Sequence, residues 1–232
     1  MDTRESAADD LKQCLGSVRQ VITSEHFFCG TLVSRPRKKQ DALSRANKES
    51  QIAALREAVR GCTRCALHAG RTQTVFGEGD LNASVVFVGE APGEEEDISG
   101  RPFVGEAGQL LTKIIAAMGL KREAVFITHV LACRPPQNRD PQPEEEVAQC
   151  RPYLVALLRI IKPRVICALG SHAARTLLEE SGPISQLRGI WREFEGIALL
   201  PTFGPAHLLQ APRDKQLVWQ DVKKIVTFLN TV

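Results

Sequence analysis

The sequence has no hydrophobic run long enough to cross a bilayer. A membrane-spanning helix needs about 20 mostly apolar residues in a row, whereas the longest apolar runs here are short segments such as Val85–Val88 and Val165–Leu169. The N-terminal segment MDTRESAADD is polar and acidic, so it lacks the apolar core of a secretory signal. We therefore expect an intracellular protein without a membrane partner.

The sequence also lacks a strong charge of either sign. Its 30 Lys and Arg residues nearly balance 27 Asp and Glu residues, which leaves a formal net charge of +3. This balance permits nucleic-acid binding but does not require it, because binding depends on a local basic face. No internal repeat or long low-complexity tract is present, and 232 residues suffice for one sizeable domain with a tail.

Residues 1–48 differ in pattern from the rest and are predicted to form an N-terminal extension and linker. They contain a short amphipathic stretch from Leu11 to Ile22, followed by the basic segment Ser34–Gln40. A solvated linker is the favoured interpretation of this basic segment, and contact with phosphates is the alternative. Residues 49–232 are predicted to form the folded domain.

Short apolar runs and helix-like stripes alternate through the predicted domain. Buried strands are predicted at 85–88, 125–130, 165–169 and 197–200, and helices at about 50–60, 110–118, 143–161, 171–178 and 217–229. Pro143, followed by three glutamates, suits the first turn of its helix, and Ser171 is a candidate N-cap. The alternation predicts an α/β fold, a three-layer α/β/α sandwich around a central four-stranded parallel sheet.

Seven cysteines are many for a protein expected in a reducing compartment, where disulfides are rare. Four of them suggest a metal site, because Cys62 and Cys65 form a C-x-x-C pair and Cys133 and Cys150 follow at longer spacing. By number and type, these ligands suit zinc and an iron–sulfur cluster equally well. The other cysteines are Cys14 and Cys29 in the extension and Cys167 in an apolar run, where a small buried side chain is expected.

Ligands of open parallel sheets bind beyond the carboxyl ends of the strands, where three predicted loops lie. These are the loop after Val88, the loop from His129 to Arg134 and the loop after Pro201. The first contains two segments rich in glycine and proline, Gly89–Gly93 and Gly100–Gly105, around a run of acidic residues. Such a backbone allows close approach to a ligand, and an acidic surface turn is the alternative.

The motifs in these loops resemble those of family 4 uracil-DNA glycosylases, the iron–sulfur group of that superfamily. G-E-A-P-G-x-x-E-D followed by G-R-P-F-V-G-E-A-G-Q-L-L is similar to the first signature of the family. The C-x-x-C pair, the segments Cys133–Pro141 and Cys150–Tyr153, and the late P-T-F-G-P-A-H-L-L occur in the family's order. The match covers about residues 50–230 and leaves the extension outside.

The resemblance implies a DNA glycosylase of base-excision repair, which hydrolyses the N-glycosidic bond of a flipped-out uracil or another deaminated base. It also implies a structural [4Fe-4S] cluster, and so favours iron over zinc; the ligands would be Cys62, Cys65, Cys133 and Cys150. The expected partner is DNA containing uracil or another deaminated base. We expect a monomer located in the cytoplasm and associated with the nucleoid.

The resemblance also implies roles for residues of the first loop. Phe103 corresponds to the aromatic platform on which the base stacks. Glu90 corresponds to an acid near the sugar, which can orient the attacking water and stabilise developing positive charge. Ala91 and Pro92 would border the base through their backbones, and Glu96 is a candidate supporting acid. The alternatives are a core aromatic for Phe103 and a solvated turn residue for Glu90.

Two positions depart from the family pattern. His129 stands where the family has Asn, and the divergent nitrogens of an imidazole cannot copy the bidentate contact of a carboxamide with uracil. Losing such a contact costs about 1–3 kcal/mol of base discrimination. Gly204 stands where the family has a His that stabilises the departing base, and glycine supplies no side-chain donor. By analogy with a lost oxyanion donor, the rate penalty is roughly 10²–10³-fold.

Three hypotheses fit these departures. The protein is a slow glycosylase that relies on Glu90 and backbone donors, or an enzyme with an altered base preference in which His129 is a donor to the leaving base. Alternatively, it is a catalytically weakened iron–sulfur protein that binds lesions. The second hypothesis is favoured, with Glu90 and His129 as catalytic residues and Gly204 bordering the base. His207, three residues after Gly204, is a candidate substitute for the missing histidine, but an ordinary surface histidine is the favoured interpretation.

The segment from Leu208 to Lys215 is predicted to contact DNA. Leu208 or Leu209 would wedge into the vacated base stack, and Arg213 and Lys215 would contact phosphates; helix packing is the alternative for the leucines. Arg134 and Arg139 are further candidates for phosphate contacts. Two interpretations from other classes also stay open: a non-catalytic iron–sulfur module that docks on a repair partner, and a zinc-containing nucleotide-binding protein.

Overall fold

A computed structural model describes residues 37–231, and residues 41–232 form one compact unit. Its helices and short helical turns are α2 (Arg37–Arg60), η1 (Ala66–Ala69), α3 (Glu94–Ser99), α4 (Glu106–Ala117), η2 (Arg122–Ala124), η3 (Pro136–Asn138), η4 (Pro143–Val147), α5 (Ala148–Ile161), α6 (Ser171–Leu178), α7 (Ile184–Leu187), α8 (Pro205–Gln210), η5 (Pro212–Asp214) and α9 (Lys215–Asn230). Its strands are β1 (Glu78–Gly79), β2 (Val85–Gly89), β3 (Phe126–His129), β4 (Val165–Leu169), β5 (Arg192–Phe194) and β6 (Ile197–Thr202).

The strands form one mixed sheet in the order β1-β3-β2-β4-β6-β5. The four central strands are parallel, as predicted, and β1 and β5 add short antiparallel edges that the sequence pattern did not indicate. Every residue of β2, β3 and β4 is buried, which explains why their β-branched runs were recognisable. The parallel register aligns the carboxyl ends of four consecutive strands at one edge.

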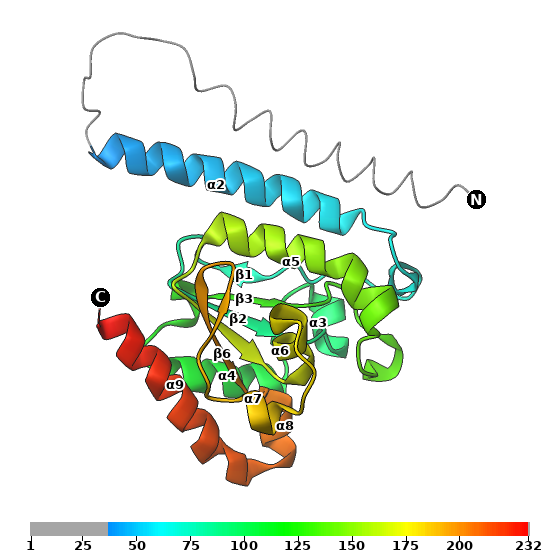
Figure 1. The fold of residues 1–232 in the computed structure, drawn as a ribbon. Coiled ribbons are helices and arrows are strands. Elements are labelled where there is room, and N and C mark those ends of the chain that lie inside the picture. The colour runs from blue at the N-terminus through cyan, green and yellow to red at the C-terminus, as the bar shows by residue number, and fades with distance from the viewer. Residues whose placement is uncertain (1–36, 232) are drawn as a thin grey trace. The chain divides into compact units, whose positions relative to one another are not determined.

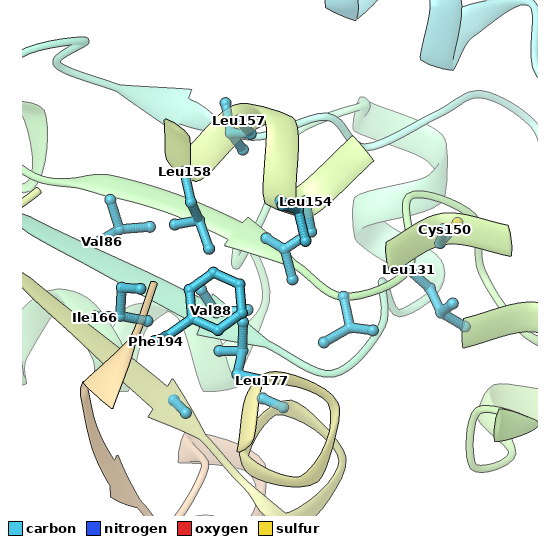
Figure 2. Close-up of a cluster of buried hydrophobic side chains, with 14 of the residues drawn as sticks. Val86, Val88, Leu131, Cys150, Leu154, Leu157, Leu158, Ile166, Leu177 and Phe194 are labelled. Carbon is cyan, nitrogen blue, oxygen red and sulfur yellow. The ribbon is translucent and has the colours of Figure 1, made fainter. Parts of the chain in front are cut away.

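Helices cover both faces of the sheet and complete the predicted three layers (Figure 1). On one face, α5 and α6 pack on side chains such as Val86, Val88 and Ile166 (Figure 2), and α2 adds Ile52 and Val59 to the same buried cluster. On the other face, α4, α8 and α9 pack on Phe87 and Ile127. Since burial of apolar surface contributes roughly 25 cal/mol per Å², these two cores dominate the stability of the sandwich.

The first described helix begins earlier than the sequence predicted. The structure places residues 41–48 in α2, whereas the sequence pattern assigned them to the linker. Lys48 donates hydrogen bonds to the carbonyls of Leu81 and Ile161 and to the side chain of Asn82. The amphipathic stretch from Leu11 to Ile22 and the extension cysteines lie outside the described residues. Within residues 37–231, no helix is long and apolar enough to span a membrane.

Two helix starts differ in detail from the prediction. Pro143–Val147 forms a π-helical turn before α5, so the α-helix itself begins at Ala148. Ser171 is the first residue of α6, and the N-cap is Gly170, with a φ of 100°. A positive φ is costly for a residue with a side chain, so glycine takes the cap position that was predicted for serine.

Candidate functional site

Four loops meet at the carboxyl ends of the parallel strands. His129 ends β3, Glu90 follows β2, Gly170 follows β4 and Gly204 lies two residues after β6. Gly89 pairs with His129 in register, and Leu169 pairs with Thr202. We call the group Glu90, Phe103, His129 and Gly204 the strand-end site, because these sequence-predicted positions gather at this edge.

The carboxylate of Glu90 lies over the loop that follows β4. Its Oε1 accepts a hydrogen bond of 2.9 Å from the backbone N–H of His172. A Cβ on Gly170 would lie 2.4 Å from the same oxygen, so only glycine leaves room for the carboxylate there. Position 170 in turn neighbours position 204, since a Cβ on Gly204 would lie 3.8 Å from the Gly170 nitrogen. Glu90 therefore faces the loop that carries Gly204.

His172 is a residue of this site that the sequence interpretation missed. Besides its backbone contact with Glu90, its ring Nε2 lies 3.6 Å from Asp140 Oδ2. The sequence contains a signal for His172, because it comes shortly after a buried strand and Gly170, just as Glu90 comes after a buried strand and Gly89. The rule that ligands bind at strand ends points to both loops equally.

Phe103 stands beside β2 with its ring stacked on His129. The ring centroids lie 4.6 Å apart at an interplanar angle of 14°. A Cβ on Gly89 would lie 2.6 Å from Phe103 Cζ and 2.7 Å from His129 Cδ2, so both rings approach a bare backbone. Phe103 therefore lies beside the backbone of Gly89, the residue before Glu90, at the carboxyl end of β2.

The imidazole of His129 is buried and neutral. Only 4% of the residue is exposed, and burial lowers its pKa from 6.5 to about 3. Its Nδ1 has no hydrogen-bond partner among the described residues. An unpaired buried polar atom costs about 1–3 kcal/mol, and such atoms are rare in folded proteins.

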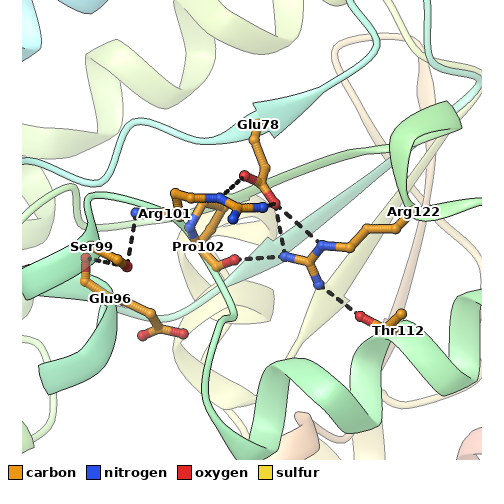
Figure 3. A network of polar contacts seen from close by, with 7 residues as sticks. All are labelled: Glu78, Glu96, Ser99, Arg101, Pro102, Thr112 and Arg122. Atoms are coloured by element: carbon orange, nitrogen blue, oxygen red, sulfur yellow. Dashed lines mark hydrogen bonds and ion pairs between the residues drawn. The ribbon is translucent and has the colours of Figure 1, made fainter.

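A cluster of ion pairs fixes the loop that carries Phe103 (Figure 3). Arg122 donates to the Pro102 carbonyl at 2.7 Å and to Glu78 Oε1 at 3.0 Å, and Arg101 donates to the other oxygen of Glu78 at 2.8 Å. Phe103 itself has a φ of 51°, which is unusual for a bulky residue. The clamp holds this strained residue, and no sequence motif had indicated Glu78 or Arg122.

Glu96, the predicted supporting acid, braces the same loop from the inside. Burial raises the pKa of Glu96, against the opposing effect of backbone hydrogen bonds from Gly93 and Phe103. These two N–H groups belong to the segments before and after α3, so Glu96 joins the two ends of this loop. Glu96 is therefore a positioning residue for the backbone of Phe103.

The remaining predicted base contacts lie beside Glu90. Ala91 is half-buried and packs against the core, and Pro92 is buried. Gly204 is the N-cap residue of α8 and has ordinary extended angles, with φ −71° and ψ 152°. A Cβ there would meet nothing closer than the Leu169 carbonyl oxygen at 3.5 Å, so a side chain fits.

His207 does not reach the place of the missing histidine. Its ring stacks on Phe203 with centroids 4.5 Å apart, and its Nε2 lies 2.6 Å from Asp214 Oδ2. These contacts hold the imidazole of α8 against Asp214 of η5. His207 is therefore engaged in local structure.

The predicted DNA-contact segment has one buried and several exposed members. Leu208 is 1% exposed and belongs to the core, so the structure gives it the packing role instead of the wedge. Leu209 is 42% exposed, and Arg213 and Lys215 are exposed as well. Arg139 forms an ion pair with Glu146.

The four predicted metal ligands line one cavity, which we call the cysteine cavity. Its lining residues are Val59, Cys62, Arg64, Cys65, His68, Arg71, Ala132, Cys133, Gln149, Cys150 and Tyr153. They come from the end of α2, η1, the loop after β3 and the start of α5. Within residues 37–231, no three His, Cys, Asp or Glu side chains are arranged to hold a single metal ion.

Arg71 connects separate parts of the cysteine cavity and was not predicted. Its guanidinium donates to the carbonyls of Arg60 and Cys62 at 2.9 Å each and to Cys133 Sγ at 3.3 Å. Burial raises the pKa of Cys133, while Arg71 opposes that rise; burial also raises the pKa of Cys150 to about 12. Buried thiols of this kind become thiolates only beside a strong positive charge, such as bound iron or zinc.

Comparison with known proteins gives the class of this fold and site. Residues 76–223 match the family model described as the uracil DNA glycosylase superfamily. The chain is 43% identical over 186 residues to a type-4 uracil-DNA glycosylase of Thermotoga maritima, which covers 78% of the chain and 96% of the relative. Type-4 enzymes of Sulfurisphaera tokodaii (44%) and Archaeoglobus fulgidus (45%) match 74% and 72% of the chain and 81% and 87% of their own lengths. The chain belongs to the uracil DNA glycosylase superfamily, and within it to the type-4 group.

Proposed function

We propose that the protein is a DNA glycosylase of base-excision repair, which hydrolyses the N-glycosidic bond of a flipped-out uracil or another deaminated base. The observation that carries the proposal is the meeting of Glu90 and Phe103 at the strand ends, in a chain of the type-4 group. An acid beside an aromatic platform supplies what the reaction needs, a stacking surface for the base and a carboxylate for the sugar.

Glu90 is the proposed catalytic acid. The backbone N–H of His172 fixes one carboxylate oxygen, and the other oxygen is left to orient a water molecule. As the bond to the base breaks, the sugar gains positive charge, which the carboxylate stabilises. Phe103 stacks the base, and the backbones of Ala91 and Pro92 border it.

The residues at positions 129 and 204 determine how well this enzyme stabilises the departing base. Gly204 offers no donor to the departing base. His129 is the proposed donor in its place, and it acts as a neutral imidazole because burial keeps its pKa near 3. A neutral donor stabilises an anionic base less than a charged one does. Because an imidazole also cannot copy the bidentate contact of a carboxamide with uracil, we propose an enzyme with an altered base preference.

The cysteine cavity is the proposed site of a [4Fe-4S] cluster held by Cys62, Cys65, Cys133 and Cys150. Four thiols on one cavity, with an arginine donating to one sulfur, fit the donor set and hydrogen bonding of such a cluster. A single zinc ion would need sulfurs about 3.8 Å apart, given Zn–S bonds near 2.3 Å. The donor set by itself suits zinc as well, and the similarity to type-4 enzymes is what favours the cluster. The cluster cross-links the end of α2 to α5 and takes no part in the chemical steps.

DNA containing uracil or another deaminated base is the proposed partner. Arg213 and Lys215 are exposed beyond α8 and would contact phosphates, which position the protein without reading sequence. Leu209 is the proposed wedge, because it is exposed and Leu208 is not. We propose that the protein acts as a monomer.

Single-turnover base release tests the proposal. Duplexes with one uracil, hypoxanthine or xanthine are incubated with excess protein, and strand breaks are revealed by alkali. We expect release of at least one base, and a fall of roughly 10²–10⁴-fold in Glu90→Gln, the range for a lost general acid or base. Glu95→Gln is the matched control, an exposed acid nearby, and should leave the rate within twofold.

A second candidate function, lesion binding without catalysis, is favoured by the glycine at position 204. It predicts no base release from any of the three duplexes at stoichiometric protein, together with salt-sensitive binding that prefers the lesion duplex to plain duplex. The same set of duplexes therefore separates the two candidates.

A further inference from the structure

The face of Phe103 that stacks on His129 is already occupied. The two rings lie 4.6 Å apart and within 14° of parallel, which is the geometry of a base on an aromatic platform. We propose that His129 takes the place of the base on Phe103 in the free protein and must leave it before a deaminated base can bind. This inference rests on the proposed function and adds a specificity-determining step to it.

The stack is buried against the backbone of β2. Both rings press on the backbone of Gly89, where a Cβ would come within 2.6 Å of Phe103 and 2.7 Å of His129. Phe103 is 8% exposed and His129 is 4% exposed. The clamp of Arg122 on the Pro102 carbonyl fixes Phe103, so the ring that must move is His129.

His129 is held weakly for a buried polar residue. Its Nδ1 has no hydrogen-bond partner among residues 37–231, and no ion pair holds the ring. Leaving the stack exposes this nitrogen to water or to polar groups of the nucleotide, which offsets part of the lost stacking. The exchange is therefore open to a planar base that restores the contact with Phe103.

The exchange changes how much a flipped base contributes to affinity. In a pocket with an open platform, stacking of the base adds directly to binding. Here, loss of the His129–Phe103 stack offsets that gain. The base itself should therefore add little to the affinity for DNA. Removal of the His129 ring should free the face of Phe103, so that stacking of the base adds to affinity.

Binding of two oligonucleotides tests this. One carries 2′-fluoro-2′-deoxyuridine, in which the fluorine disfavours positive charge on the sugar and so prevents cleavage; the other carries a tetrahydrofuran abasic analogue at the same position. The measured quantity is the ratio of their affinities. We expect a ratio below about threefold for the wild-type protein and a rise of about tenfold in His129→Ala, within the range for one base–aromatic stack.

Two further variants serve as controls. His129→Phe keeps an aromatic ring on Phe103 and should hold the ratio at or below the wild-type value. His207→Ala removes another stacked histidine, on Phe203, and should leave the ratio unchanged. Thermal unfolding checks that each variant is folded.

Nuclear magnetic resonance of the wild-type protein gives a readout that needs no substitution. The sequence has five histidines, and the ring current of Phe103 should shift the carbon-bound ring protons of His129 upfield. The fluorouridine oligonucleotide should abolish that shift, and the abasic one should leave it. Persistence of the shift with bound base would overturn the proposal, because the base would then lie elsewhere.

The outcomes also separate this inference from the proposed function. A protein that releases uracil, but whose affinity ratio is the same with and without the His129 ring, keeps the function and loses the exchange. A protein that releases no base, but whose His129→Ala variant gains base-dependent affinity, loses the enzyme and keeps the exchange. Ratios near one in every variant reject the exchange.

Discussion

The segment from His129 to Cys133 joins the strand-end site, at its first residue, to the cysteine cavity, at its last. The two regions differ in how many of the residues expected from the family they retain. The cavity keeps all four expected cysteines, whereas the strand-end site replaces two of its expected side chains, at positions 129 and 204. The proposed cluster depends on all four ligands together, so the loss of one cysteine would release it. Pocket residues act singly, so they can change while the fold stays.

Loss of a cavity cysteine should have the largest effect. We expect Cys150→Ala to lose most of its iron and to lower the thermal unfolding midpoint by about 10 °C or more, because metal binding is coupled to folding. Iron content, visible absorbance and calorimetry measure this. Cys167→Ala is the matched control, a buried thiol of β4 outside the cavity, and should keep its iron. Full iron in Cys150→Ala would remove Cys150 from the ligand set.

Restoring the family residues should have the next largest effect, at the strand-end site. We expect Gly204→His to raise the single-turnover rate on uracil by roughly 10²–10³-fold, the value of one donor at a developing anion. The backbone accepts a Cβ there, because its nearest contact, the Leu169 carbonyl oxygen at 3.5 Å, is an ordinary van der Waals distance. Gly204→Ala adds a side chain without a donor and should gain nothing.

His129→Asn should add a smaller gain on uracil, about 1–3 kcal/mol of discrimination from a bidentate contact. Combination with Gly204→His tests whether the two positions act together. No gain in the single or double variants would mean that these positions are not the family's functional ones.

The strand-end site should make the free energy of unfolding depend more strongly on pH than the cysteine cavity does, by a few kcal/mol. The unfolded chain protonates His129 near pH 6.5, whereas burial keeps the folded pKa at about 3. Acidification therefore favours unfolding, and stability that is full above pH 6.5 falls toward pH 3. Relative to His129→Asn, the wild-type protein should lose about 2 kcal/mol between pH 7 and pH 5. Urea unfolding measures this, with the exposed His68→Asn as the reference; parallel pH profiles for wild type and His129→Asn would show that His129 titrates normally.

The smallest expected effect concerns the exposed cations beyond α8. Arg213→Ala and Lys215→Ala should each weaken binding to lesion and plain duplex alike, and should each reduce the slope of log affinity against log salt by about 0.9. Fluorescence anisotropy at several salt concentrations measures the slope. A loss confined to lesion duplex would assign these residues to base recognition.

Much of the fold could be predicted from the sequence, because its signals are local. The runs 85–88 and 165–169 are apolar and β-branched, so a buried strand is their natural conformation. The edge strands β1 and β5 are two and three residues long, and pairing with a neighbour defines them, so no local pattern indicated either.

The residues of the two sites also fall into those that a local motif indicates and those that only the folded structure reveals. Glu90, Phe103 and the four cysteines stand in motifs and were found by resemblance. The contact of His172 with Glu90, the bonds of Arg71 to the cysteine cavity and the clamp of Arg122 join residues far apart in the chain. Such contacts arise only when the sheet brings its loops together. The stack of His129 on Phe103 likewise depends on the register of β2 and β3.

The room at position 204 has a consequence for work at the bench. The resemblance to family 4 enzymes leads us to expect an imidazole there, and this chain has no side chain at that position, while its backbone angles remain ordinary. Free imidazole is a small solute with the same ring, so it can stand in for a side chain that this position lacks. We therefore expect free imidazole to raise the rate of base release. It is present in the buffers that elute tagged proteins from nickel resin, so turnover should be compared before and after dialysis.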